Sequence, residues 1–545
     1  MKEQEIMSQN TSWVQILALI VLVRNSTETK NILLLVSDDM RPNIGSYEES
    51  SSSMFRQPHM YTPNLDALSS EALQFDNAYC QLPLCSPSRT SFMTSRRPDT
   101  TRVTSISPYW RNVGGNFTTI PQFFKDKGYW TVGGGKIFHP GVASGYDDPI
   151  SWSEEFNVAE NIHEDCTHAT IDWHPGIHTW KAITKDEMEA KGALQDTLQA
   201  DWAINKLHEL APNARNGLTP FFLAFGTQRP HLPFCFPDEY FLYYPESVID
   251  IPYNPYCPIN MPEIEQKHPI PVGGIHEIQF YRDCIPRPGP NGVPNISKVN
   301  VTFSEQKIRE LRRAYYATVS YVDNEIGRLL DELKSLELEN DTIVVFIGDH
   351  GYNLGEHAQW CKENNFETSA RVPFMIKIPD IKGTKGVHID SLVELVDLFP
   401  TLVEAAGFEK LQLCPEISSS IKLCTEGRSL IPLIEDPSRN DGKEAVFWQQ
   451  PNQLSTTLPM RNVPTQMGYS MRTTKYRYTE WVKIKNLGGH AFVPEWDKPV
   501  AHEELYDLHI DPQENNNVYN IFEYAEVKAN LSLRLHAGWR NEMWK

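Results

Sequence analysis

The sequence lacks the cysteine spacing of a zinc domain and the positive charge of a nucleic-acid binder. None of its nine cysteines forms a Cys-x-x-Cys pair, which argues against a thiolate zinc site. The formal net charge is −20, whereas binding to phosphate backbones needs a basic surface. We therefore predict no nucleic-acid partner. Near pH 5 most of the 17 histidines would be charged, which would shrink the negative charge in an acidic compartment.

Long apolar runs are also scarce. The uncharged run at residues 13–23 is too short to span a bilayer comfortably but fits the hydrophobic region of a signal peptide. A buried strand is the alternative interpretation. We predict a signal peptide and leader at residues 1–27, no stable membrane span, and a secretory-pathway protein that is lysosomal or secreted. Sequons for N-glycosylation support this, at Asn25, Asn116, Asn295, Asn300, Asn340 and Asn530.

The odd number of cysteines leaves one thiol to explain in a secreted protein. Cys414 and Cys424 flank a short polar loop, and we predict that they form a disulfide. The sequence does not assign the other pairings.

Buried strands alternate with helices along most of the chain. Residues 31–40 and 342–347 contain continuous apolar runs, which are typical of strands covered on both faces of a parallel sheet. Residues 130–132 and 221–225 also read as short strands. Apolar residues recur at helical spacing from 304 to about 338. The pattern predicts an α/β fold with a large, mostly parallel sheet between helices.

The length of 545 residues exceeds what one hydrophobic core usually covers. A change of composition at residues 438–444 predicts a boundary between a catalytic domain (28–442) and a smaller C-terminal subdomain (443–545). Strand-like segments at 469–483 and 504–510 predict an antiparallel sheet there, followed by a final helix.

Proline marks two expected loops and one expected helix start. The Pro- and Gly-rich stretches 252–262 and 286–294 are predicted surface connections. Thr62 and Pro63 are predicted as the N-cap and first residue of a helix. The side chains that this helix directs inward are expected to be Leu65, Leu68 and Leu73.

Acidic residues follow both strongly apolar strands. Asp38 and Asp39 end the first, and Asp349 with His350 ends the second. Adjacent carboxylates repel each other unless a cation compensates them. Carboxyl ends of parallel strands meet at one edge of a sheet, so these oxygens would favour a hard ion such as Ca²⁺ or Mg²⁺. Taken singly, each pair would more often be a solvated strand end.

Cys85 is predicted to lie at the N-terminus of a helix. Pro87 suits the first helical turn, where unpaired N–H groups and the helix dipole favour anions. Arg89 adds a cation one turn later. The residues alone leave two simpler readings open, namely a structural disulfide with Cys80 and a thiolate nucleophile with a lowered pKa.

The run Cys85-Ser86-Pro87-Ser88-Arg89, followed by Thr94-Ser95-Arg96, resembles the signature of the sulfatase family. Ser95 stands where that family usually has Gly, and Arg229 stands where Lys is common. The similarity spans about residues 31–520 and is lowest at 142–192, where we expect loops that shape the substrate site. Further similar motifs lie at residues 96–102, 109–111, 115–117, 135–136, 138–141, 229–234, 349–351, 354–357, 360–362, 467–472, 476–479 and 504–506.

This resemblance implies an alkaline-phosphatase-like sandwich and a specific set of site residues. Cys85 would be oxidised to formylglycine by the formylglycine-generating enzyme, which would leave eight cysteines that could pair. Ca²⁺ would be bound by Asp38, Asp39, Asp349 and His350, with residue 85 as a further ligand. Lys136 and Lys362 would bind sulfate oxygens, Arg89 would hold the formylglycine oxygen, and the base and acid would be His139 and His231.

The implied reaction is hydrolysis of a sulfate ester in a glycosaminoglycan or oligosaccharide. The expected substrate is 2-O-sulfated iduronate in heparan or dermatan sulfate. The alternatives are a sulfatase for another sugar, choline or aryl sulfate, and a non-catalytic protein that binds sulfated glycans. A phosphatase or phosphodiesterase fits less well, since those relatives usually have Ser or Thr as nucleophile and two zinc ions.

Overall fold

The computed structural model describes residues 29–51, 54–163, 166, 179–262, 303–381, 383–439, 442–452, 464–488 and 490–543. The predicted signal peptide at 1–27 and the Pro-rich stretch 286–294 lie outside these residues. No helix among the described residues is long and apolar enough to cross a membrane.

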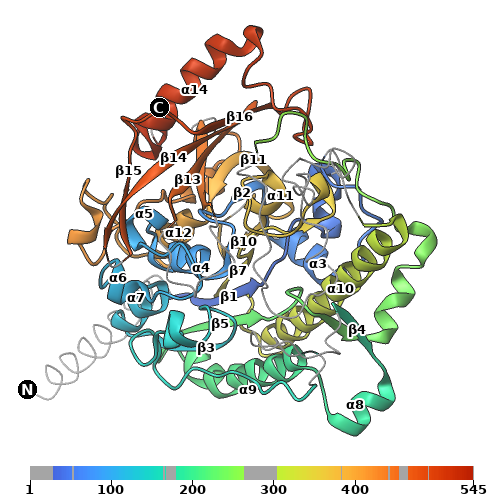
Figure 1. Ribbon diagram of the computed structural model, residues 1–545. Helices are drawn as coiled ribbons and strands as arrows, with labels where there is room; N and C mark the ends of the chain where they lie inside the picture. The colour runs from blue at the N-terminus through green and yellow to red at the C-terminus, as the bar shows by residue number, and fades with distance from the viewer. Residues whose placement is uncertain are drawn as a thin grey trace, which may run out of the picture.

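A seven-stranded sheet forms the centre of the molecule (Figure 1). Four of its pairings are parallel, and only β10 runs antiparallel to both of its neighbours. The predicted mostly parallel α/β sheet is therefore confirmed. In spatial order the strands are β11 (Val387–Glu394), β2 (Leu73–Tyr79), β10 (Arg371–Lys377), β7 (Thr342–Gly348), β1 (Asn31–Ser37), β5 (Phe221–Thr227) and β3 (Trp130–Gly135).

Helices cover both faces of this sheet, which explains why β1 and β7 are buried at every position. Leu33 and Leu35 pack into the core beneath α3 (Pro63–Glu71), α9 (Gln195–Arg215) and α10 (Glu305–Ser335). The alternate residues of β1 face the opposite core, beneath α4 (Cys85–Thr94), α7 (Ile120–Asp126) and α12 (Leu398–Ala405). Each fully buried Leu or Ile contributes about 1.5–3 kcal/mol, which fixes the strand at the centre.

Shorter elements complete this part of the chain. The two-stranded sheets are β4 (Trp180–Ile183) with β6 (Phe234–Pro237), and β8 (Asn353–Leu354) with β9 (Trp360–Cys361). The shorter helices are α2 (Glu48–Ser51), α5 (Pro98–Thr101), α6 (Trp110–Val113), α8 (Lys185–Lys191), α11 (Glu367–Ala370) and α13 (Ile431–Glu435).

The helix predictions hold with two corrections. Ser304 caps α10, since its side chain accepts a hydrogen bond from the Lys307 N–H. Pro63 begins α3 as predicted, but Thr62 makes no side-chain capping bond. Its hydroxyl instead accepts from the Gly45 N–H at 2.8 Å and donates to Asp66 at 3.2 Å. Leu73 is buried in β2 rather than in the helix, because α3 ends at Glu71.

A second, antiparallel sheet lies near the C-terminus, drawn in orange and red in Figure 1. Leu531 and Leu535 of α14 (Ala525–Ala537) pack against its Met471 and Tyr478. The predicted antiparallel sheet and final helix are therefore present. Its strands are β12 (Ala445–Pro451), β13 (Gln466–Thr473), β14 (Tyr476–Gly488), β15 (Ala491–Pro494) and β16 (His502–Asp507).

The cysteines follow the prediction only in part. Cys414 and Cys424 form the predicted disulfide. Cys166 pairs with Cys235 across 69 residues, and Cys257 is also disulfide-bonded. The expectation that all eight cysteines other than Cys85 could pair is not met, because Cys80 and Cys361 are not in disulfides.

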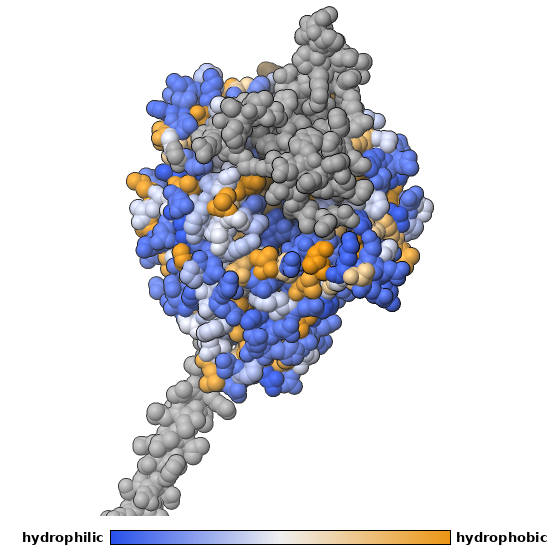
Figure 2. All heavy atoms as spheres, turned by 60° about the horizontal axis from the view of Figure 1, so that its bottom comes forward, coloured by the Kyte–Doolittle hydropathy of each residue, from blue (hydrophilic) through white to orange (hydrophobic). Residues whose placement is uncertain are grey.

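The outer surface seen in Figure 2 is mostly hydrophilic, with hydrophobic residues in small separate groups. Such scattered apolar residues are normal on a globular protein and do not indicate a docking surface.

Candidate active site

The parallel pairing of β1 with β7 brings the predicted acids together. Ser37 lies opposite Gly348 in the register, so the residues that follow both strands meet at one edge of the sheet. The Asp39 N–H donates to Asp349 Oδ1 at 3.0 Å, and the His350 N–H donates to the same oxygen at 2.9 Å. All four predicted metal ligands are buried.

Helix α4 directs Cys85 at these acids. Cys85 is its first residue, and Ser88 one turn on donates a hydrogen bond to the Asp349 carbonyl oxygen. The sulfur lies 3.4 Å from His350 Nε2 and 3.3 Å from Lys362 Nζ. The reading of Cys85 as a disulfide partner of Cys80 is wrong, since neither cysteine is in a disulfide.

The thiolate reading is also opposed by the structure. Burial, followed by the charge of Asp38, raises the pKa of Cys85 to about 12. The effect of the helix N-terminus is therefore outweighed by desolvation and by neighbouring carboxylates. An unmodified thiol at this position would be a weak nucleophile near neutral pH.

Local hydrogen bonds explain how Ser95 is accommodated in a backbone conformation that favours glycine. Ser95 ends α4 in the left-handed region, with φ 52°. Its hydroxyl donates to the Val396 carbonyl at 2.6 Å and lies 2.8 Å from Thr425 Oγ1. Its carbonyl accepts from the Glu426 N–H at 2.9 Å. These bonds offset the cost that a side chain meets at positive φ.

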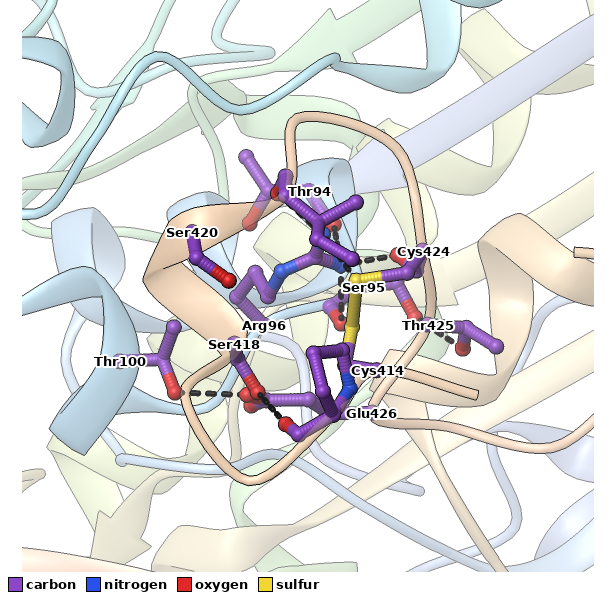
Figure 3. The surroundings of a disulfide bond; sticks show 12 residues. Thr94, Ser95, Arg96, Thr100, Cys414, Ser418, Ser420, Cys424, Thr425 and Glu426 are labelled. Atoms are coloured by element: carbon purple, nitrogen blue, oxygen red, sulfur yellow. Dashed lines mark hydrogen bonds between the residues drawn. A yellow bond between two sulfur atoms is a disulfide. The ribbon is translucent and has the colours of Figure 1, made fainter. Parts of the chain in front are cut away.

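The loop closed by the Cys414–Cys424 disulfide contacts the same end of α4 (Figure 3). Arg96 donates to the sulfur of Cys424 at 2.8 Å and to the Ile421 carbonyl at 3.2 Å. Burial lowers the pKa of Arg96 to about 10, with only Glu426 opposing the shift. The guanidinium thus depends on this loop for its hydrogen bonds.

Three cations balance the acidic cluster. Arg89 donates to Asp38 Oδ1 at 2.9 Å and to Asp349 Oδ2 at 3.0 Å. Lys136 forms an ion pair with Asp38, and Lys362 forms one with Asp39. Burial alone would raise the pKa of Asp38, but the charges of Lys136 and Arg89 hold it well below its usual range. For Asp39 burial dominates, and its pKa is raised.

The cluster fits a divalent cation. Asp39 Oδ2 is buried and has no hydrogen-bond partner among the described residues, so no hydrogen bond replaces its lost hydration. Ligand atoms of Asp38, Cys85, Asp349 and His350 all lie within 4.8 Å of one another. Clustered carboxylate oxygens are typical of hard divalent ions.

His350 is oriented toward this cluster. Its Nδ1 lies 2.9 Å from the Gly351 carbonyl, to which it would donate. The opposite ring nitrogen, Nε2, lies 3.4 Å from both Asp39 Oδ1 and Asp349 Oδ2. A backbone carbonyl that fixes the tautomer in this way is a common arrangement for a metal-binding histidine.

The two remaining predicted histidines differ in position. His231 Nε2 lies 3.9 Å from Asp39 Oδ2, and its Nδ1 lies 2.8 Å from the Leu232 carbonyl. His139 forms no hydrogen bond or ion pair with Cys85 among the described residues. Its Nδ1 lies 3.0 Å from the Pro140 carbonyl. Burial, followed by the charge of Lys136, lowers the pKa of His139 to about 3.

Sequence reasoning missed several supporting residues. Tyr315 was expected only as an apolar position of the long helix, yet its hydroxyl donates to the Asp39 carbonyl at 2.9 Å. Asp196, on the first turn of α9, accepts from the Gln228 N–H at 2.5 Å and so supports the turn before His231. A tyrosine within an apolar stripe and an acid on a first helical turn give only weak signals of such roles.

A buried ion cluster also went unrecognised. Glu356 pairs with Arg41 at 3.0 Å and with Arg312 at 3.1 Å. Burial raises the pKa of Glu356, but the two arginines outweigh it and hold the pKa at about 2. The partners are distant in sequence, so no local spacing could reveal this cluster.

Comparisons with known proteins agree with this geometry. The Sulfatase family model matches residues 30–408, and the model described as N-sulphoglucosamine sulphohydrolase, C-terminal, matches residues 355–541. The chain is 34% identical to iduronate 2-sulfatase of Mus musculus, over 93% of this chain and 94% of that protein. The human iduronate 2-sulfatase is also 34% identical, over 91% and 92%. Choline-sulfatase of Rhizobium meliloti is 27% identical over 90% of this chain and 83% of that protein.

Solved structures share the fold. Phosphonate monoester hydrolase of Agrobacterium radiobacter matches with a TM-score of 0.65 and 21% identity, covering 93% of this chain and 95% of that one. A 2-O GAG sulfatase matches with a TM-score of 0.62 and 20% identity, covering 94% and 92%. The predicted alkaline-phosphatase-like architecture is therefore confirmed. The chain belongs to the sulfatase family and is a sulfuric ester hydrolase.

Proposed function

We propose that this enzyme hydrolyses sulfate esters with a formylglycine made from Cys85 and with bound Ca²⁺. Its proposed substrate is 2-O-sulfated iduronate in heparan or dermatan sulfate. The observation that carries the proposal is the position of Cys85, at the N-terminus of α4 and within 3.4 Å of both Lys362 Nζ and His350 Nε2.

Modification of Cys85 would remove a chemical difficulty. A thiol with a pKa of about 12 is a poor nucleophile, whereas a hydrated formylglycine supplies two hydroxyl groups, one to attack sulfur and one to expel sulfate. Arg89 is held by Asp38 and Asp349, so its guanidinium is fixed one turn from residue 85. We assign it the role of holding the oxygen of that residue.

The metal ligands in this proposal are Asp38, Asp39, Asp349 and His350. The Asp39 oxygen that accepts no hydrogen bond among the described residues supports the presence of a cation. When bound, Ca²⁺ would supply Lewis-acid polarisation of the nucleophilic oxygen and of the sulfate.

Lys136 and Lys362 are proposed to bind the sulfate oxygens. Their Nζ atoms lie 3.8 Å and 3.3 Å from Cys85 Sγ. In the modified residue, the nucleophilic oxygen would replace this sulfur atom. Buried ammonium groups at these distances would stabilise the charge that develops on the sulfate oxygens.

The two histidines are assigned proton transfer. His231 is proposed as the acid that protonates the leaving alcohol, and its Nε2 points at the carboxylate cluster. His139 is proposed as the base that assists sulfate expulsion, and its lowered pKa of about 3 means that its ring is unprotonated at acidic pH.

The substrate assignment rests on relatives and on charge. Two iduronate 2-sulfatases are 34% identical to this chain. The chain itself is acidic, and protonation of its surface histidines near pH 5 would reduce the negative charge and ease the approach of a polyanion. We therefore propose a lysosomal or secreted enzyme that passes through the secretory pathway and is matured by the formylglycine-generating enzyme. Exposed sequons at Asn116, Asn340 and Asn530 support this route.

We also propose the division into a catalytic domain at residues 28–442 and a C-terminal subdomain at 443–545. The antiparallel sheet and α14 lie within the second range. A different sulfatase specificity, for another sugar, choline or aryl sulfate, is the alternative function.

The test is a panel of sulfated uronate disaccharides, with choline sulfate and 4-nitrophenyl sulfate for comparison. We expect release of sulfate from the 2-position of iduronate with the highest kcat/KM, and no turnover by Cys85→Ala. Preference for choline or an aryl sulfate would contradict the substrate assignment. Turnover by Cys85→Ala would contradict the role of residue 85.

A further inference from the structure

A recess with a cavity volume of about 230 Å³ adjoins Lys136. It lies beyond the carboxyl ends of β3 and β5, next to the first turn of α9. Its lining includes Lys136, Tyr146, Asn161, Gln195, Gln228 and Arg229.

The floor of the recess is cationic. Lys136 and Arg229 are each only 3% exposed, and no acidic side chain belongs to the lining. In a chain with a net charge of −20 this is an unusual local composition. Lys136 is paired with Asp38, which does not line the recess, so Arg229 supplies the charge that favours an anionic ligand.

Arg229 has no anionic partner in direct contact. Its guanidinium donates to the Cys166 carbonyl at 2.8 Å and to the His231 carbonyl at 3.4 Å, and no described carboxylate forms an ion pair with it. Burial lowers the pKa of Arg229, and Asp196 offsets this only in part. Asp196 is turned toward the backbone, since it accepts from the Gln228 N–H. A buried guanidinium in this state retains donors for an additional anion.

The rim supplies neutral hydrogen-bonding groups. Gln195 donates to the Ala159 carbonyl at 2.9 Å, which fixes the position of its amide oxygen. Asn161 donates to the Cys166 carbonyl at 2.9 Å, and its oxygen accepts from the His163 N–H at 3.2 Å. The side-chain amide of Gln228 has no hydrogen-bond partner among the described residues. Amide groups around a cationic floor suit a sugar that carries hydroxyl groups and a negative charge.

Two segments that the sequence singled out meet at this recess. Arg229 belongs to the expected motif at 229–234, and Tyr146 and Asn161 belong to the segment 142–192, where we expected loops that shape the substrate site. The Cys166–Cys235 disulfide ties that segment to β6. The recess therefore combines residues of an expected substrate-shaping segment with a lysine of the proposed sulfate site.

We propose that this recess is a second anion subsite of the enzyme, with Arg229 as its specificity-determining cation. Because it rests on the proposed function, its ligand is a second anionic group of the sulfated substrate, either the uronate carboxylate or a sulfate on the neighbouring sugar. Lys136 binds the sulfate that is cleaved, and Arg229 binds the second anion through its planar guanidinium.

The test measures kcat and KM of Arg229→Gln and Arg229→Lys on matched substrates. These are a 2-O-sulfated iduronate disaccharide with an N-sulfated neighbour, its carboxyl-reduced form, its form without the N-sulfate, and 4-nitrophenyl sulfate. For Arg229→Gln we expect KM for the parent disaccharide to rise at least about tenfold more than KM for 4-nitrophenyl sulfate, as loss of a charged hydrogen bond implies. Arg229→Lys should give an intermediate rise in KM, because lysine keeps the positive charge but lacks the paired N–H donors of the planar guanidinium.

The substrate arms identify the anion. If Arg229→Gln no longer raises KM for the carboxyl-reduced form, Arg229 binds the carboxylate. If it no longer raises KM for the form without the N-sulfate, Arg229 binds that sulfate. Arg215→Gln is the matched control, since Arg215 is half-exposed and forms an ion pair with Glu337 at 4.0 Å. An equal loss of kcat/KM on every substrate, or no loss at all, would overturn the subsite.

The experiment distinguishes an incorrect substrate assignment from an incorrect assignment of the subsite. If the enzyme cleaves 4-nitrophenyl sulfate but no uronate sulfate, the proposed substrate falls. The subsite is then measured as inhibition of 4-nitrophenyl sulfate hydrolysis by glucuronate relative to glucose. Stronger inhibition by glucuronate that is lost in Arg229→Gln supports the subsite, and equal inhibition by both sugars overturns it.

Discussion

The cations next to each buried carboxylate determine its pKa in the cluster around Cys85. Asp38 and Asp39 are adjacent in sequence, yet the pKa of one is lowered and that of the other is raised. Asp38 is paired with Lys136 and Arg89, whereas Asp39 is paired with Lys362, and its second oxygen accepts no hydrogen bond and has His231 Nε2 3.9 Å away. The sequence predicted that these acids meet, because they follow strands that pair. It could not predict how the cations divide between them, since that depends on side-chain positions from distant segments.

His231 gives a prediction at the residue scale. His231→Gln should lower kcat at least about 100-fold for an alkyl sulfate and no more than about tenfold for 4-nitrophenyl sulfate, because only a poor leaving group requires protonation. The measurement is kcat across a series of sulfates with leaving groups of rising pKa. His208→Gln is the control, since His208 is mainly exposed and pairs with Glu332. Equal losses along the series would contradict an acid role.

Among the elements, the long and continuous ones were the most predictable. β1, β7 and α10 follow from uninterrupted apolar runs or helical periodicity. The prediction of Thr62 as the N-cap of α3 was wrong, because its hydroxyl forms hydrogen bonds with Gly45 and Asp66 instead. The Cys166–Cys235 disulfide joins residues 69 apart, and no local pattern could indicate it.

The loop closed by Cys414 and Cys424 should support helix α4. Replacing both cysteines with Ala should lower the free energy of unfolding by about 2–4 kcal/mol, since the cross-link no longer constrains the unfolded chain. Activity should also fall, because Arg96 and Ser95 at the end of α4 hydrogen-bond to this loop. Denaturant unfolding and kcat measure the two effects. Unchanged activity despite lower stability would show that the loop does not position α4.

The segment that leads to Lys362 contains a pH-sensitive contact. His357 is buried, stacks on Phe366 and lies 2.7 Å from the Gln513 carbonyl. Burial lowers the pKa of His357 from 6.5 to about 4, so the folded state favours the neutral ring. Its contribution to stability is complete above pH 6.5 and is lost as the pH falls through about 4.

His357→Gln should therefore flatten the dependence of Tm on pH between 6.5 and 4. The measurement is Tm at several pH values for the wild type, for His357→Gln and for the exposed control His208→Gln. The same slope in all three proteins would contradict a role for His357.

At the scale of the whole molecule, the two sheets are joined by buried ion pairs. Arg472 of β13 donates to Glu367 of α11 at 2.8 Å, and Lys443 forms ion pairs with Glu394 and Asp397 at 2.6 Å. Burial raises the pKa of Glu367, but Arg472 and Arg371 outweigh it. The sequence predicted a second sheet in the C-terminal part. It gave no sign of these contacts, because their partners lie 46 to 105 residues apart.

Arg472→Gln should destabilise both sheets together. It leaves the carboxylate of Glu367 buried without its main partner, which costs about 3–5 kcal/mol. Chemical denaturation should show a single transition at lower denaturant concentration. Lys498→Gln is the exposed control. Separate unfolding of the C-terminal part, with the rest unaffected, would contradict energetic coupling through this pair.

The most direct test of the proposed mechanism is mass spectrometry of the peptide that contains residue 85, from active enzyme made in a secretory host. We predict an aldehyde in place of the thiol, in proportion to specific activity. A peptide that carries only the unmodified Cys85 thiol in fully active enzyme would contradict the proposal.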